Sequence, residues 1–160
     1  HPRVLVMATP MTIHEEKLHN LIAKYEDKAT IIPLPCPGLM DFVERGDLDG
    51  EDLHRYLEDL LYSYRNNQID AAVLGCTHYP LLRSTIGKIM GENVNLVNPA
   101  YETAISLGEL LKKNNIRADI NAKPKYQFFV SDAADKFKSF ANSIMPFRID
   151  ETNRINIEEY

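Results

Sequence analysis

Short apolar runs alternate with amphipathic stretches along the first hundred residues of the sequence. Four runs have the length of buried strands and end at turn residues: residues 4–8, 29–34, 69–75 and 94–97. Apolar positions at helical spacing predict helices near 12–25, 39–43, 49–64, 81–90 and 101–113. Because strands and helices alternate, the pattern predicts an α/β domain with a four-stranded parallel sheet flanked by helices on both faces.

Two helix starts are predicted from capping residues. Thr12 with Glu15 three residues later fits a capping box, and Asp49 precedes the strongest amphipathic stretch as an N-cap. The helix after Thr12 is expected to bury a face made of four residues, namely Leu18, Leu21, Ile22 and Tyr25.

The pattern changes near residue 114. Residues 117–125 are polar and connecting, residues 126–131 form a fifth apolar strand, and residues 132–145 predict one more helix. The tail from residue 148 is mostly polar. The sequence therefore predicts a strand and a helix beyond the main sheet.

Composition narrows the class of protein. The 160 residues are 44% hydrophobic and 26% charged, as in soluble globular domains, and the net charge of −5 disfavours nucleic acid as a partner. No apolar run approaches the roughly 18 residues of a membrane span, and no signal-peptide pattern opens the sequence, so a cytoplasmic protein is expected. The two cysteines lack paired zinc-ligand spacing and are expected to be free thiols.

Chemistry-bearing residues follow the predicted strands, at the sheet edge where open α/β folds bind ligands. Cys76, Thr77 and His78 follow the third strand and precede a helix, a setting that favours thiolate over thiol. By themselves, Thr12 is most simply a helix cap and Glu44 a solvated charge. Free cysteines are often buried and behave as small apolar residues, and this is expected for Cys36, which lies between two prolines. Tyr79 is expected to be a packing residue. The residues alone leave a thiol hydrolase, a thiol base and a redox sensor open.

One eight-residue stretch closely resembles the signature of the cofactor-independent glutamate racemases, in the aspartate/glutamate racemase superfamily. It is Gly75-Cys76-Thr77-His78-Tyr79-Pro80-Leu81-Leu82. Three further segments resemble family motifs in the right order: Val6 to Thr12 (with Ala8 where glycine is usual), Cys36-Pro37-Gly38-Leu39 through Glu44, and Asn98-Pro99-Ala100 with Glu102-Thr103-Ala104. The resemblance therefore extends along most of the chain.

The resemblance implies a role for each matching residue. Cys76 would be one of two catalytic cysteines that flank the substrate α-carbon, and His78 would help its proton transfer. Thr77, Thr9 and Thr12 would bind the substrate, and Glu44 would polarise His78. Racemisation needs an acid–base group on each face of the carbon, which two thiols can provide without a metal or another cofactor.

The resemblance also implies that half of this site lies elsewhere. The family's Asp-Ser loop and its Cys-Asn-Thr motif, which carries the partner cysteine, are not found here, and Cys36 matches a different family position. Residues 2–98 would be the complete second racemase domain, and residues 99–160 would return to the first domain. The expected partners are glutamate and the absent N-terminal region, and a homo-oligomer is compatible with the resemblance.

Two functions therefore remain. One is a portion of a glutamate racemase that supplies D-glutamate for peptidoglycan and is inactive alone. The other is an inactive module that binds an acidic amino acid. A thiol hydrolase is a third possibility, with Glu44 and His78 as its base and orienting residue.

Overall fold

Four parallel strands form the predicted sheet in the computed structural model, which describes residues 1–159. The strands are β1 (Arg3–Ala8), β2 (Thr30–Pro35), β3 (Ala71–Leu74) and β4 (Asn95–Val97). Their order across the sheet is β2-β1-β3-β4, and every pairing is parallel. The predicted α/β class and four-stranded parallel sheet are confirmed.

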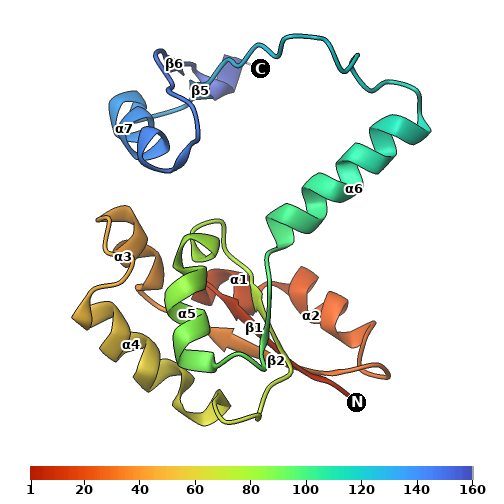
Figure 1. Cartoon of the computed structure of the whole chain (residues 1–160), viewed down its shortest axis with the longest axis vertical. Coiled ribbons are helices and arrows are strands. Elements are labelled where there is room, and N and C mark those ends of the chain that lie inside the picture. Colours follow the sequence, from red (N-terminus) through yellow and green to blue (C-terminus); the bar gives the residue numbers. More distant parts are fainter. Residues whose placement is uncertain (160) are drawn as a thin grey trace. The chain divides into compact units, whose positions relative to one another are not determined.

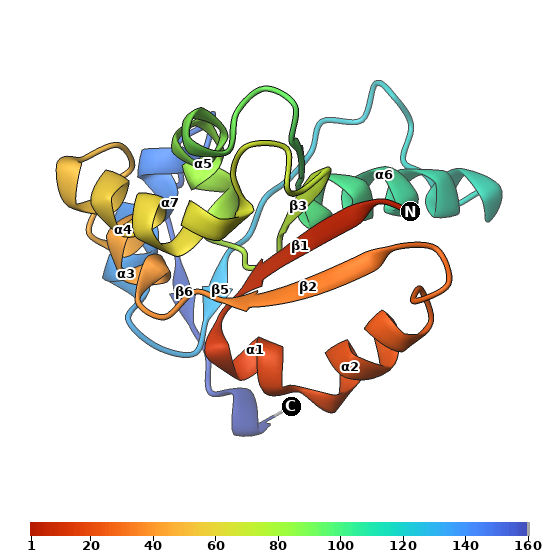
Figure 2. The same ribbon diagram turned by 90° about the horizontal axis from the view of Figure 1, so that it is seen from below.

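Helices cover both faces of this sheet. They are α1 (Pro10–His14), α2 (Glu16–Ala23), α3 (Leu39–Glu44), α4 (Glu51–Leu61) and α5 (Arg83–Met90), with short 3-10 turns η1 (Tyr62–Tyr64) and η2 (Tyr79–Leu82). Figures 1 and 2 show α2 on one side of the sheet and α4 and α5 on the other. This arrangement follows from right-handed crossovers that run in opposite directions from the middle of the sheet.

The core lies between the sheet and the α4–α5 layer. Leu53, Leu57 and Leu61 of α4 recur every four residues and are each 0% exposed. They pack in the same core as Leu5 of β1 and Ile86 of α5, which are also fully buried. The strongest amphipathic pattern of the sequence therefore marks the best-buried helix.

The first helix begins earlier than its capping box predicts. Pro10 occupies the first helical turn, so Thr9 is the N-cap and its hydroxyl accepts a hydrogen bond from Thr12 N at 3.3 Å. Glu15 is extended, with ψ 130°, and separates α1 from α2. The prediction that Thr12 caps this helix is wrong, because a proline at the first position moves the cap to the residue before it.

The buried face predicted for α2 is also wrong. No residue of α2 is buried, and Leu21 is 51% exposed. Leu18 and Ile22 are half-buried, so the apolar stripe of α2 is only partly covered. The hydrophobic period was correct for a helix but did not indicate what that helix packs against.

Asp49 does not cap α4. The N-cap is Gly50, and the Asp49 carboxylate instead accepts hydrogen bonds from three side chains of α4 and α5. Asp49 lies one residue before the observed N-cap, and its side chain links α4 to α5 instead of capping α4.

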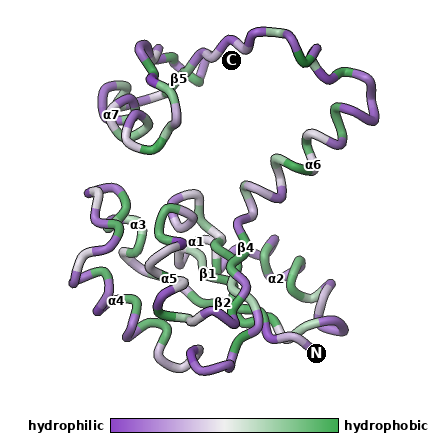
Figure 3. Tube along the Cα trace, in the orientation of Figure 1, coloured by the Kyte–Doolittle hydropathy of each residue, from purple (hydrophilic) through white to green (hydrophobic). Residues whose placement is uncertain are grey.

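The chain forms two units, 1–116 and a second that begins at Arg117. The first unit includes α6 (Pro99–Lys113), which Asn98 caps by accepting a hydrogen bond from Ala100 N at 3.0 Å. No residue of α6 is buried, although hydrophobic positions recur along it (Figure 3). The contact boundary therefore falls after α6, whereas the family resemblance placed the domain change at residue 99.

The second unit contains α7 (Ala134–Ile144) and two short strands, β5 (Phe129–Val130) and β6 (Asn153–Arg154), followed by η3 (Ile157–Glu159). The strand predicted over residues 126–131 is only two residues long, and it pairs with β6, which the sequence did not predict. It lies outside the four-stranded sheet. None of the helices within residues 1–159 has the length and apolarity to cross a bilayer.

Candidate functional site

The chain direction across the sheet changes between β1 and β3. From β1 the chain moves outward to β2, and from β3 it moves outward the other way to β4. Open α/β sheets bind ligands at the carboxyl edge beside such a change of direction. Thr9 leaves β1 at this point, and Cys76 follows β3. The two sequence-predicted loops therefore meet at the switch point.

Gly75 allows these loops to approach. Its N–H donates to Met7 O at 2.8 Å, and a Cβ on Gly75 would lie 2.8 Å from that same oxygen. Contacts this short with a backbone atom are not tolerated without movement, so only glycine fits here. The residue places Cys76 directly beside the end of β1.

Cys76, His78 and Glu44 form a chain of polar contacts. Cys76 Sγ lies 3.8 Å from His78 Nδ1, and His78 Nε2 lies 3.6 Å from Glu44 Oε1. The imidazole side chain is 22% exposed and the Glu44 side chain 40%. With Nε2–H directed at the carboxylate, Nδ1 presents its lone pair to the thiol, as a thiol base requires.

The predicted threonines lie at the same edge. Thr77 Oγ1 is 3.2 Å from His78 Nδ1, so it shares the ring nitrogen that faces Cys76. Thr9 Oγ1 and Thr12 Oγ1 are 3.0 Å apart, because the N-cap geometry of α1 brings them together. Thr12 and Thr77 are exposed, and Thr9 is half-buried. All three hydroxyls therefore lie near the carboxyl ends of β1 and β3.

Cys36 has a different environment from Cys76. It is 1% exposed, and burial raises the pKa of its thiol to about 12. Tyr79, fully buried, donates a hydrogen bond from its hydroxyl to Cys36 O at 3.4 Å, and burial raises the pKa of Tyr79 as well. Cys36 is thus the packing residue that its two prolines predicted. Near neutral pH it stays protonated and cannot act as a base.

The described residues 1–159 contain no group of three or more histidine, cysteine or acidic side chains arranged to hold a metal ion. Cys76, His78 and Glu44 instead provide a thiol, a proton-accepting ring nitrogen and a carboxylate in sequence. The thiol can lose its proton to the ring nitrogen and then act as a base or a nucleophile. The geometry alone does not choose between these two actions.

Comparison with known proteins shows which family of proteins the chain resembles. The chain is 41% identical over 128 residues to the glutamate racemase of Clostridium perfringens strain ATCC 13124. Its structure resembles glutamate racemase from Francisella tularensis, solved in complex with D-glutamate, with a TM-score of 0.87 over 100% of this chain at 27% identity. It resembles isoform RacE1 of Bacillus anthracis with a TM-score of 0.85 over 97% of the chain at 30% identity.

In sequence and in structure, the chain is similar to glutamate racemases along most of its length. No family model matches it. The chain spans about half the length of its relatives: the C. perfringens alignment covers 80% of this chain and 49% of that protein, and the F. tularensis match covers 60% of that chain. The racemase resemblance of the sequence motifs is confirmed, and the residue roles that it implies stay predictions.

The sequence did not reveal one cluster next to this racemase signature. Asp49, Thr85 and Lys88 join the loop after α3 to α5, and His54 joins the same loop to α4. One signal was present in the sequence. Thr85 lies on the apolar stripe of α5 beside Ile86, and a hydroxyl that is only 1% exposed on such a stripe needs a hydrogen-bond partner.

Proposed function

We propose that this chain provides one side of the active site of a cofactor-independent glutamate racemase, which interconverts L- and D-glutamate. The observation that carries the proposal is the position of Cys76 at the β1–β3 switch point, 3.8 Å from His78 Nδ1. The family relationship and the D-glutamate bound to the F. tularensis relative support this substrate.

In the proposed reaction, Cys76 acts as a thiolate base. It takes the α-proton of glutamate, so the Cα–H bond breaks and its electron pair stays on the substrate, spread into the carboxylate. A second acid then delivers a proton to the opposite face of the same carbon. One proton is removed and one is returned, so the product is the other enantiomer. In the reverse direction Cys76 donates the proton, and His78 Nδ1 stabilises its thiolate form.

Thr9, Thr12 and Thr77 are proposed to hold the substrate. Their hydroxyls lie in the segments that follow β1 and β3, with Thr12 in the first turn of α1, and hydroxyls can donate to a carboxylate or accept from an ammonium group. Donors fixed on a sheet edge stabilise the charge that develops on the substrate carboxylate as the α-proton leaves.

The second acid–base group is proposed to come from the family region that this sequence does not span. Cys36 is the only other cysteine, and its 1% exposure removes it from the site. The same region is proposed to cover the apolar residues of α6, with 2–98 as one racemase domain and 99–160 as part of the other. The complete enzyme would make D-glutamate for peptidoglycan in the cytoplasm.

The test is circular dichroism of D- or L-glutamate in the presence of two proteins. One is this chain alone, and the other is this chain joined to the remaining family region of a racemase relative. The optical signal is expected to decay only with the joined protein, and Cys76→Ser is expected to abolish the decay. Racemisation by the 160-residue chain alone would contradict the need for a second acid–base group from the remaining family region.

The presence of a single accessible thiol favours one alternative, a module that binds an acidic amino acid without racemising it. Isothermal titration with glutamate distinguishes the two. Binding to the joined protein without any racemisation supports the binding module, whereas racemisation excludes it.

A further inference from the structure

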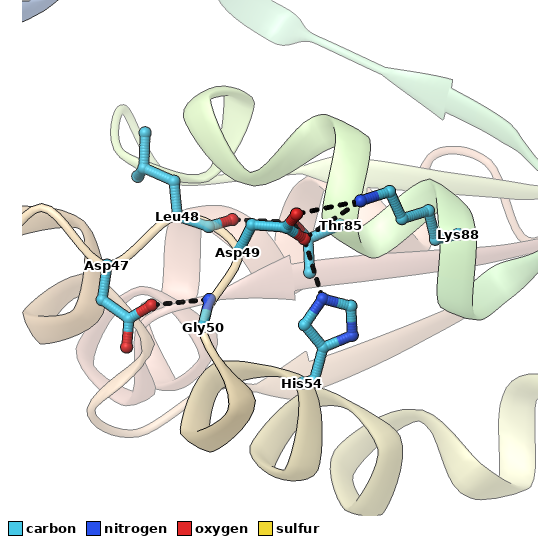
Figure 4. Close-up of polar contacts among 7 residues, drawn as sticks. All are labelled: Asp47, Leu48, Asp49, Gly50, His54, Thr85 and Lys88. Atoms are coloured by element: carbon cyan, nitrogen blue, oxygen red, sulfur yellow. Dashed lines mark hydrogen bonds and ion pairs between the residues drawn. The ribbon is translucent and has the colours of Figure 1, made fainter.

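Asp49 connects three elements around the racemase signature. Its carboxylate accepts hydrogen bonds from Lys88 Nζ at 3.0 and 3.1 Å and from Thr85 Oγ1 at 3.1 Å, both on α5. It also lies 2.7 Å from His54 Nε2 on α4. Figure 4 shows these side chains converging on one carboxylate. We call Asp49, His54, Thr85 and Lys88 the Asp49 cluster.

Hydrogen bonds hold the loop between Glu44 and Asp49 in place. Asp47 N donates to Phe42 O at 2.9 Å, which closes the end of α3, and Asp47 Oδ1 accepts from Gly50 N at 2.9 Å. Leu48 O accepts from Thr85 Oγ1 at 2.7 Å. A displacement of Asp49 therefore moves the last turn of α3, where Glu44 is the final residue.

The α5 residues of the Asp49 cluster are connected to His78 through η2. Thr85 and Lys88 lie on α5, which continues directly from η2, and His78 is the N-cap of η2. The Asp49 cluster therefore joins the segment that carries Glu44 to the segment that carries His78. The 3.6 Å contact between these two side chains depends on how closely the two segments are held.

We propose that Asp49 is a positioning residue, which holds Glu44 against His78 Nε2 and so keeps Nδ1 directed at the Cys76 thiol. Its importance for racemisation rests on the proposed function. The positioning itself does not, because it concerns contacts within this chain only.

A second anchor limits the size of the effect. Phe42 of α3 packs on Tyr56 of α4 with ring centroids 5.5 Å apart, and Arg45 stacks over Phe42 at 4.0 Å. Loss of the Asp49 contacts is therefore expected to loosen α3 rather than release it. The interactions of Asp49 also agree with its lowered pKa of about 2, caused first by His54 and then by Lys88 and Thr85.

The test is the rate of Cys76 alkylation by iodoacetamide at pH 7, measured on the complete 160-residue chain. Buried Cys36 does not compete. Glu44→Gln and Asp49→Asn are each expected to slow Cys76 alkylation about threefold, and the double variant is expected to be no slower than either single variant. Lys88→Gln, a milder change on the surface, is expected to act in the same direction.

Asp52→Asn is the matched control, because it removes the same charge from α4 at a side chain that is 75% exposed and pairs with the exposed Arg55 at 3.4 Å. It is expected to leave the alkylation rate unchanged. The tautomer of His78, from the nitrogen chemical shifts of its ring, is a second readout. Asp49→Asn is expected to reduce the Nε2–H form in the folded protein, which a loss of global stability alone does not do.

Two results would overturn the proposal. One is an unchanged alkylation rate and an unchanged His78 tautomer in folded Asp49→Asn. The other is a double variant whose rate falls by the product of the two single effects, which would mean that Asp49 acts independently of Glu44. No glutamate is used, so these results stand whether or not the complete protein is a racemase.

Discussion

The absence of a Cβ atom on Gly75 allows the end of β3 to lie close to β1. A side chain at Gly75 would meet the backbone oxygen of Met7, and that oxygen already accepts the Gly75 N–H. The sequence showed a glycine before the cysteine, but the contact across to β1 depends on the sheet order, which no local pattern contains. The same holds for Asp49, whose partners Thr85 and Lys88 are distant in sequence.

Gly75→Ala is expected to lower the free energy of unfolding by about 1–3 kcal/mol, because the added methyl group forces β1 and β3 apart. Urea denaturation followed by circular dichroism measures this. Gly108→Ala is the control, since no atom lies within 4 Å of its new methyl group on α6, and alanine there is expected to be neutral or slightly stabilising. Equal effects of the two substitutions would contradict the close contact at Gly75.

Cys36 is expected to make stability fall in alkaline solution. Its thiol ionises near pH 9 when unfolded but near pH 12 when folded, so above pH 9 the unfolded chain binds fewer protons. The free energy of unfolding should therefore decrease by up to about 1.4 kcal/mol per pH unit above pH 9, with no contribution from Cys36 below it. Urea denaturation at pH 8, 9 and 10 tests this.

Cys36→Ala is expected to flatten that alkaline dependence between pH 9 and 10. Burial also raises the pKa of Tyr56 to about 12, so Tyr56 adds to the decrease near pH 10, and the difference between the two proteins at each pH gives the contribution of Cys36. An equally steep decrease in the alanine variant would mean that Cys36 is not the group responsible.

Elements were predicted best where their apolar positions face the sheet. All four strands and the α4 stripe were recognised, because buried runs and a repeat of about 3.6 residues are local properties of the sequence. The split of the first helix at Glu15 was missed, and so was the short β6 strand. The first depends on where Pro10 lies in a helical turn, and the second on a partner strand far away in sequence.

Loss of an apolar side chain is expected to destabilise the protein strongly in α4 and very little in α6. Leu57→Ala in α4 should cost about 2–5 kcal/mol of unfolding free energy, since Leu57 is 0% exposed. Leu110→Gln in α6 should change it by less than about 0.5 kcal/mol, because Leu110 is 55% exposed. Thermal or urea unfolding compares the two, and a large loss for Leu110→Gln would show that α6 is packed in this chain.

At the scale of the whole molecule, the four-stranded sheet, its covering helices and the racemase signature all belong to residues 1–116. The chain spans about half the length of its glutamate racemase relatives, and it provides one accessible thiol. The fold class and the grouping of Cys76, His78 and Glu44 were therefore predictable from the sequence. The role of Asp49 was not, because it depends on packing between helices.

The fragment 1–116 is expected to fold without the second unit, because the buried layer between the sheet, α4 and α5 lies wholly inside it. Calorimetry should give one cooperative transition, and Cys76 of the fragment should be alkylated at the rate seen in the complete chain. A fragment that lacks a cooperative transition would contradict this division.

Exchange of the glutamate α-proton in D2O tests the central claim most directly, with each enantiomer supplied separately to this chain joined to the remaining racemase region. If Cys76 is the base on one face only, Cys76→Ala should abolish inversion of both enantiomers but remove deuterium exchange from only one of them, by about a hundredfold or more. Exchange that is lost equally for both enantiomers, or for neither, would contradict a one-sided thiol base at Cys76.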